Sequence, residues 1–221
     1  DGRYAIFTVD VSKTDLPREL VYADKDYDIE GSLIYSKKTN DVIGVYHGEA
    51  NNAKIFFEES HVDFQKALDK AIPDAFNNIE SMSADESRYI LFTSNSTRPG
   101  AYFLGDRKQA SLSFVLEQYP LLTDKKLSGK TKISYQARDN TTIEGYVTQP
   151  HENAPQHKAA LIIPHGGPMA RNYAGFDWFS EFFASRGYLV LEPNFRGSSG
   201  YGFKFEMASI KSWGGAMQND L

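Results

Sequence analysis

The fold is decided by residues 159–168, which read AALIIPHGGP. The first five are a continuous apolar run, as expected of a strand that is buried on both faces of a sheet. Farther along, residues 178–183 carry aromatic side chains at helical spacing, Arg186-Gly187 ends that helix, and residues 188–191 form a second apolar strand. A strand, a helix and a strand joined by tight connections predict the start of an α/β sheet.

The chain before this sheet has a different texture. Residues 132–137 and 142–149 predict a hairpin that leads into the α/β sheet, whereas residues 118–131 are polar and rich in turn formers. We therefore place a domain boundary in this stretch, which divides the chain into residues 1–124 and residues 125–221.

Residues 1–124 are predicted to form short strands separated by turns. Two of the strands have nearly the same sequence, RYAIFT at residues 3–8 and RYILFT at residues 88–93, and a third strand at residues 41–46 lies between them. The offset of 85 residues is about twice the 40–45-residue period of a propeller blade. The repeat predicts blades of a β-propeller. Since two or three blades cannot close a ring, these residues are expected to form only part of the propeller. A chance similarity of two hydrophobic strands is the alternative.

One helix interrupts these strands. Apolar residues recur with helical spacing between Phe64 and Ile72, which indicates one buried face, and Pro73 ends the pattern. Ser60 and Asp63 stand three residues apart before it and predict a capping box at its start.

Composition excludes several classes of protein. The 24 basic and 29 acidic residues give a net charge of −5, so no basic face is offered to nucleic acid. The absence of cysteine excludes disulfides, thiolate metal sites and a cysteine nucleophile. No apolar run reaches the roughly 20 residues that a membrane span needs. We expect a soluble protein, with the cytoplasm as the favoured compartment and the periplasm as the alternative, and with no metal and no organic cofactor.

The loop after the first apolar strand contains the first candidate site. Two consecutive glycines, Gly166 and Gly167, let a substrate approach bare backbone, and their N–H groups are suited to an oxyanion hole. His165 precedes them and Pro168 follows. The alternative is a simple glycine turn between a strand and a helix.

The second candidate site is residues 194–202, NFRGSSGYG, which follow the second apolar strand and open on the same edge of the sheet. Arg196 is the candidate substrate-binding residue, since a guanidinium binds a carboxylate bidentately; an internal salt bridge that fixes the loop is the equal alternative. Neither Ser198 nor Ser199 has glycines two residues before and two residues after it, as a nucleophile elbow requires.

Together these segments resemble the prolyl oligopeptidase family of serine peptidases, and within it the acylaminoacyl-peptidase and dipeptidyl-peptidase-like branch. The resemblance rests on four motifs: IIPHGGP (162–168), SRGY (185–188), NFRGSSGYG (194–202) and WGGAMQNDL (213–221). It implies the C-terminal blades of a β-propeller in residues 1–124 and the N-terminal part of an α/β-hydrolase domain in residues 125–221. It also implies that Gly167 donates its N–H to the oxyanion, with His165 and Gly166 shaping that loop.

The resemblance further implies that the nucleophilic serine lies in a Gly-x-Ser-x-Gly elbow beyond the WGG segment, with the Asp and His farther on. No serine of this sequence has that pattern. We therefore expect a fragment that is inactive alone, from a parent that hydrolyses short peptides through an acyl-enzyme. An esterase and a non-catalytic propeller binding module are the alternatives. An open apolar sheet edge at Ile162 and Val190 would require an oligomer or the complementing remainder of the parent.

Overall fold

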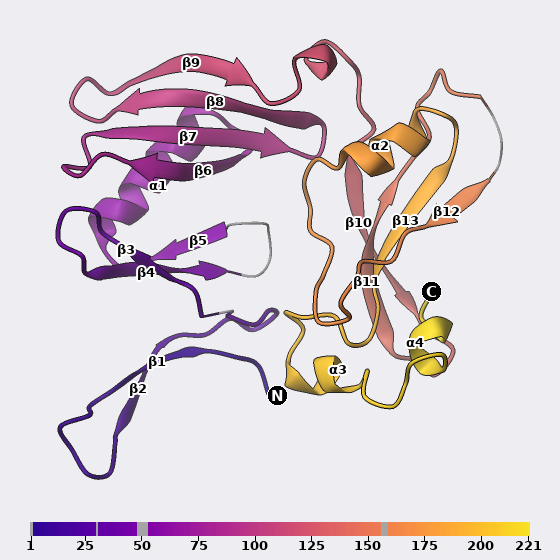
Figure 1. Ribbon diagram of the computed structural model, residues 1–221, viewed down its shortest axis with the longest axis horizontal. Coiled ribbons are helices and arrows are strands. Elements are labelled where there is room, and N and C mark those ends of the chain that lie inside the picture. The colour runs from indigo at the N-terminus through magenta and orange to yellow at the C-terminus, as the bar shows by residue number, and fades with distance from the viewer. Residues whose placement is uncertain (1, 30, 48–52, 156–158) are drawn as a thin grey trace.

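The computed structural model describes residues 2–29, 31–47, 53–155 and 159–221 (Figure 1). Within these residues the strands form four separate sheets. The first group of elements is β1 (Ile6–Val9), β2 (Arg18–Tyr22), β3 (Leu33–Tyr35), β4 (Val42–His47), β5 (Ala53–Phe56), α1 (Glu59–Ala71), β6 (Phe76–Met82), β7 (Arg88–Asn95), β8 (Arg98–Asp106) and β9 (Ser111–Glu117). The second group is a 3-10 turn (Pro120–Leu122), β10 (Lys130–Gln136), β11 (Thr142–Thr148), β12 (Ala160–Ile162), α2 (Trp178–Ala184), β13 (Leu189–Asn194), α3 (Phe203–Met207) and α4 (Ala216–Asn219).

The first group consists of antiparallel sheets of neighbouring strands: β1-β2, β3-β4-β5 and β6-β7-β8-β9. The three strands expected from the sequence are β1, β4 and β7. The two similar sequences lie on β1 and β7, and each of these strands pairs with the strand that follows it. The sheets lie beside one another in Figure 1, and the described residues form no closed ring.

Helix α1 forms an apolar core with the β6–β9 sheet. Leu68 of the helix is buried with Tyr89 and Leu91 of β7, and Phe64 meets the Tyr89 ring edge-on at 5.1 Å between centroids. The predicted capping box is wrong: the helix begins at Glu59, after Glu58, and no side chain caps it. Ser60 lies within the first turn, because the helix extends toward the N-terminus beyond its apolar stripe.

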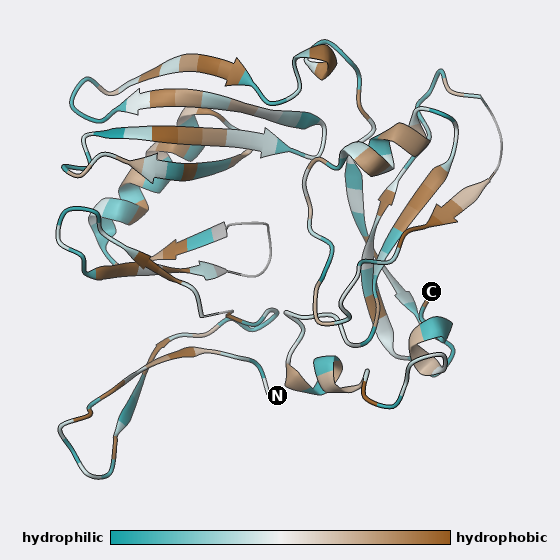
Figure 2. Cartoon of the chain, viewed as in Figure 1, coloured by the Kyte–Doolittle hydropathy of each residue, from teal (hydrophilic) through white to brown (hydrophobic). Residues whose placement is uncertain are grey.

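The second group contains a mixed sheet with the order β10-β11-β13-β12. The expected hairpin is β10 and β11, which pair along their whole length. Strands β12 and β13 are parallel and α2 connects them, so the expected strand–helix–strand unit is confirmed. Figure 2 shows hydrophobic residues along both strands of this unit.

Two expectations about burial in this sheet are wrong. Strand β12 is not covered on both faces: it is the edge strand, and 47% of the Ile162 surface is exposed. Val190, expected to lie at an open edge, is fully buried, and its strand β13 is no edge strand, since it has β11 on one side and β12 on the other. The apolar edge of the described sheet is therefore β12 alone.

Local sequence sets both ends of α2. The Asp177 side chain accepts hydrogen bonds from the N–H groups of Phe179 and Ser180, which caps the N-terminus. At the other end Gly187 has a φ of 91°, and its N–H donates to the Ala184 carbonyl. These caps fix where the loop before the helix ends and where β13 begins.

The N-terminal residues pack on the loop that follows β13. Asp28 is buried, and its carboxylate accepts hydrogen bonds from the N–H groups of Tyr4 (2.8 Å) and Gly202 (2.7 Å). The Asp28 N–H donates to the Gly200 carbonyl at 3.0 Å. Residues far apart in the sequence are thus joined directly beside the candidate site. In the described part of the chain no helix is long and apolar enough to cross a membrane.

Candidate active site

The two candidate loops meet at one edge of the mixed sheet. Residues 163–177 follow β12 and residues 195–202 follow β13. Since β12 and β13 are parallel, both loops leave from the carboxyl ends of their strands, which is where α/β proteins bind ligands. The structure therefore brings together His165, Gly166 and Gly167 on one loop and Arg196 on the other.

Gly167 occupies a backbone position that only glycine tolerates. Its φ is 128°, and a Cβ atom there would lie 2.8 Å from the Met169 nitrogen. Gly166 differs, because a Cβ atom on it would meet nothing within 4 Å. In the described residues no acceptor takes the Gly167 N–H, so this donor is free to bind an incoming oxyanion.

His165 is held by contacts on three sides. Its ring stacks on Phe195 at 4.5 Å between centroids and 12° between planes. Nδ1 lies 2.8 Å from the Gly166 carbonyl oxygen, and Nε2 lies 2.7 Å from Ser198 Oγ. Burial lowers the pKa of His165 below its ordinary value of 6.5, which favours the neutral ring.

The neutral ring has one N–H, and the geometry decides where it is. The Gly166 carbonyl only accepts, so the proton of the neutral ring belongs on Nδ1, and Nε2 faces the Ser198 hydroxyl as an acceptor. Ser198 Oγ also lies 2.6 Å from the Phe195 carbonyl oxygen, the second acceptor for the same hydroxyl proton. Ser198 is completely buried, so it positions His165 and has no access to a substrate.

Arg196 is engaged inside the chain. Its Nε and Nη2 donate to the buried Asp220 carboxylate, each at 2.7 Å, and Nη1 donates to Asp139 at 2.7 Å. Hydrogen bonds from the guanidinium hold the pKa of Asp139 well below its usual range. This arrangement favours the alternative in which Arg196 fixes its loop, tying it to α4 and to the β10–β11 turn. A substrate-binding role for Arg196 stays a prediction.

The 164–168 loop opens into a shallow cavity of about 330 Å³. Its walls are the 164–168 loop and Phe195 on one side and the C-terminal residues on the other, including Trp213 and Met217. Trp213 is 76% exposed, so the cavity has an apolar rim that an acyl group of a substrate could contact.

Sequence reasoning missed three residues near these loops: Ser198 as the partner of His165, Asp220 as the partner of Arg196, and the buried cation Arg171. The signal for the first was available, since both segments follow neighbouring parallel strands. Among the described residues no group of three or more His, Asp or Glu side chains is arranged to hold a metal ion.

Comparison with known proteins identifies relatives. Residues 174–221 match the family model described as the prolyl oligopeptidase family. The chain is 29% identical to dipeptidyl aminopeptidase BIII of Pseudoxanthomonas mexicana, with 98% of this chain and 32% of that protein covered. It is 28% identical to dipeptidyl peptidase family member 6 of Caenorhabditis elegans, with 92% and 30% covered. The chain thus spans about a third of the length of these relatives.

Solved structures share the fold. A puromycin-hydrolyzing peptidase of Mycobacterium tuberculosis matches 97% of this chain and 34% of its own with a TM-score of 0.70 at 18% identity. An acylaminoacyl peptidase of Pyrococcus horikoshii matches 92% of this chain and 30% of its own with a TM-score of 0.57, also at 18% identity. At these identities the likeness concerns the fold alone.

Proposed function

Because the chain belongs to the prolyl oligopeptidase family, in its dipeptidyl- and acylaminoacyl-peptidase-like branch, we propose that the whole protein is a serine peptidase that hydrolyses short peptides. The observation that carries this proposal is the Gly167 N–H, unpaired within the described residues at the carboxyl end of β12. A donor in that place suits an acyl transfer, in which negative charge develops on a carbonyl oxygen.

The proposed reaction proceeds through an acyl-enzyme. A serine outside the present sequence attacks the peptide carbonyl, and the Gly167 N–H donates to the oxygen as it becomes an oxyanion. His165 and Gly166 hold the loop in place, since His165 is stacked on Phe195 and bonded to buried Ser198. Without the Ser-His-Asp triad, residues 1–221 are expected to be inactive alone.

The domain assignment belongs to the same proposal. We assign residues 1–124 to the C-terminal blades of a β-propeller and residues 125–221 to the first part of an α/β-hydrolase domain. The antiparallel β6–β9 sheet supports the first assignment and the β12–α2–β13 unit supports the second. The exposed apolar edge at β12 supports the expectation that the remainder of the parent chain, or a second copy, covers it.

Labelling with a fluorophosphonate probe tests the proposal. The whole protein is treated with the probe and its intact mass is measured, while hydrolysis of a dipeptidyl amide and of a matched ester is followed. We expect one label per chain and hydrolysis of the amide. Label with ester hydrolysis alone would favour an esterase, and a protein without label or turnover would favour a binding module. Residues 1–221 alone serve as the unlabelled control.

A further inference from the structure

Arg171 is a buried cation with no charged partner among the described residues. The residue is only 6% exposed, and its Nε and Nη1 atoms have no hydrogen-bond partner among the described residues. Nη2 donates to the Tyr201 hydroxyl at 3.4 Å, which is a long hydrogen bond. No carboxylate of the described residues lies within 4.0 Å of the guanidinium, although buried charges are normally paired.

The other cations in the region show how unusual this is. Arg196 bonds to two carboxylates, Asp139 and Asp220. Lys130 likewise lies 2.7 Å from Glu192 and 3.6 Å from Asp177. Arg171 instead lies among tyrosine rings, with its guanidinium carbon 4.6 to 5.2 Å from the ring centroids of Tyr27, Tyr173 and Tyr201. Such contacts stabilise a cation but leave its N–H groups unsatisfied.

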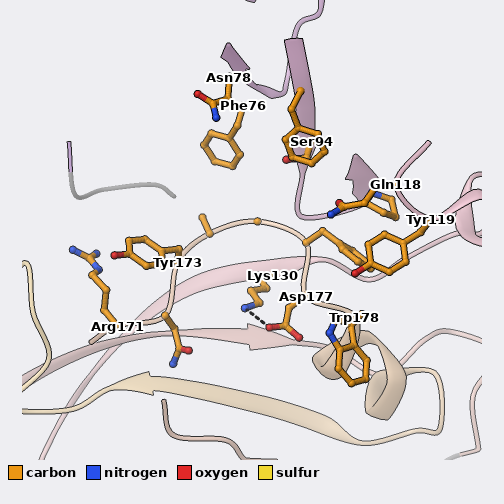
Figure 3. Close-up of a pocket in the computed structure, with 16 residues that line it drawn as sticks. Phe76, Asn78, Ser94, Gln118, Tyr119, Lys130, Arg171, Tyr173, Asp177 and Trp178 are labelled. Carbon is orange, nitrogen blue, oxygen red and sulfur yellow. Dashed lines mark ion pairs between the residues drawn. The ribbon is translucent and has the colours of Figure 1, made fainter. Parts of the chain in front are cut away.

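Arg171 lines a cavity of about 410 Å³ between the β6–β9 sheet and the loop that precedes α2 (Figure 3). A second unsatisfied group lies on the other wall. Asn78 of β6 donates its Nδ2 to Glu80 at 2.5 Å, which leaves Oδ1 as a buried acceptor without a donor. Figure 3 shows Asn78 on the sheet side of the cavity and Arg171 on the loop side.

The remaining wall suits a short peptide. Phe76, Tyr119 and Trp178 supply aromatic surface, and Gln118 adds an amide. The charged side chains of the described lining are Lys130, Asp177 and Arg171. Lys130 is paired with Asp177 and with Glu192, so Arg171 is the one charged group of the described lining without an ion-pair partner. A ligand that satisfies the cavity therefore offers an anion to the guanidinium and an N–H to Asn78.

We propose that this cavity is a subsite for the carboxylate of a short peptide, with Arg171 binding the carboxylate and Asn78 accepting a peptide N–H. Arg171 follows Gly167 by four residues, so the residue that would bind the carboxylate lies on the same loop as the proposed oxyanion donor. As part of a peptidase the subsite rests on the proposed function. Carboxylate binding itself is measured without turnover, which keeps the two proposals separable.

The test is calorimetric titration of the whole protein with glycyl-phenylalanine and with its C-terminal amide. We expect the free acid to bind at least tenfold more tightly. In Arg171→Gln the acid and the amide should bind equally, whereas the matched control Arg186→Gln should keep the preference. Arg186 also stacks on an aromatic ring, Phe182 at 3.5 Å, but lies outside the cavity. Equal binding to the unaltered protein, or a preference that survives Arg171→Gln, would overturn the proposal.

A second variant covers the case in which Arg171→Gln does not fold. Asn78→Leu keeps the cation and removes the acceptor, so both ligands should bind at least fivefold more weakly while the acid stays preferred. No loss for either ligand would overturn the placement in this cavity. Glycyl-glutamate α-amide has its carboxylate on the side chain instead of at the C-terminus. Its affinity, compared with that of glycyl-phenylalanine, shows which of these two carboxylates the subsite binds. A protein that binds the acid through Arg171 but hydrolyses no amide keeps the subsite and refutes the peptidase.

Discussion

Replacing Gly167 by alanine should reduce turnover by the whole protein about 100-fold. At a φ of 128° an alanine is strained, and its Cβ would lie 2.8 Å from the Met169 nitrogen, inside the 3.0 Å that real Cβ atoms essentially never pass. The neighbouring atoms are backbone, so the loop must move and the Gly167 N–H must leave its place. Loss of one oxyanion donor costs about 10²–10³ in kcat, or roughly 2.7–4 kcal/mol.

The assay is steady-state hydrolysis of a dipeptidyl amide, with kcat and KM measured separately. The loss should appear in kcat with KM little changed, because the oxyanion exists only in the transition state. Gly166→Ala is the matched control: its Cβ meets nothing within 4 Å, so its kcat should stay within about twofold of the original. Thermal unfolding confirms that both variants are folded. A Gly167→Ala enzyme with unchanged kcat, or a Gly166→Ala enzyme equally impaired, would refute the role assigned to the Gly167 N–H.

Three further predictions concern stability. Asp220→Asn should lower the free energy of unfolding by about 3–5 kcal/mol, because it leaves Arg196 in a buried site with half its charge compensation removed. Asp139→Asn, at the exposed end of the same network, should cost much less in the same urea titration; equal losses would contradict this. Because burial lowers the pKa of His165, the unfolded chain binds the proton more readily, so this contribution is present above about pH 6.5 and lost as the pH falls toward the folded pKa. In His165→Asn the melting temperature should therefore depend less on pH in that range. An unchanged dependence on pH would argue against this contribution of His165. Leu91→Ala should cost about 2–5 kcal/mol in urea unfolding, since Leu91 is fully buried against α1, and a loss below about 1 kcal/mol would place the core elsewhere.

Much of the local structure was predictable from the sequence. The apolar run that became β12, the hairpin β10–β11 and the aromatic spacing of α2 depend on residues a few positions apart. The glycines of the 164–168 loop indicated an oxyanion site for the same reason, since glycine is needed where the backbone itself is strained. The predicted start of α1 was wrong, because an apolar stripe does not mark where helical hydrogen bonding begins.

The partners of charged and polar groups were decided only by the tertiary structure. The sheet order β10-β11-β13-β12 makes β12 an edge strand and buries Val190, and no periodicity within either strand encodes that order. Arg196 meets Asp139 across 57 residues, and His165 meets Ser198 across 33. Arg171 is buried by rings from Tyr27 and Tyr201, which lie on opposite ends of the chain. Sequence patterns indicate which residues favour burial or pairing, whereas the packing of distant segments determines which residues become buried and which pairs form.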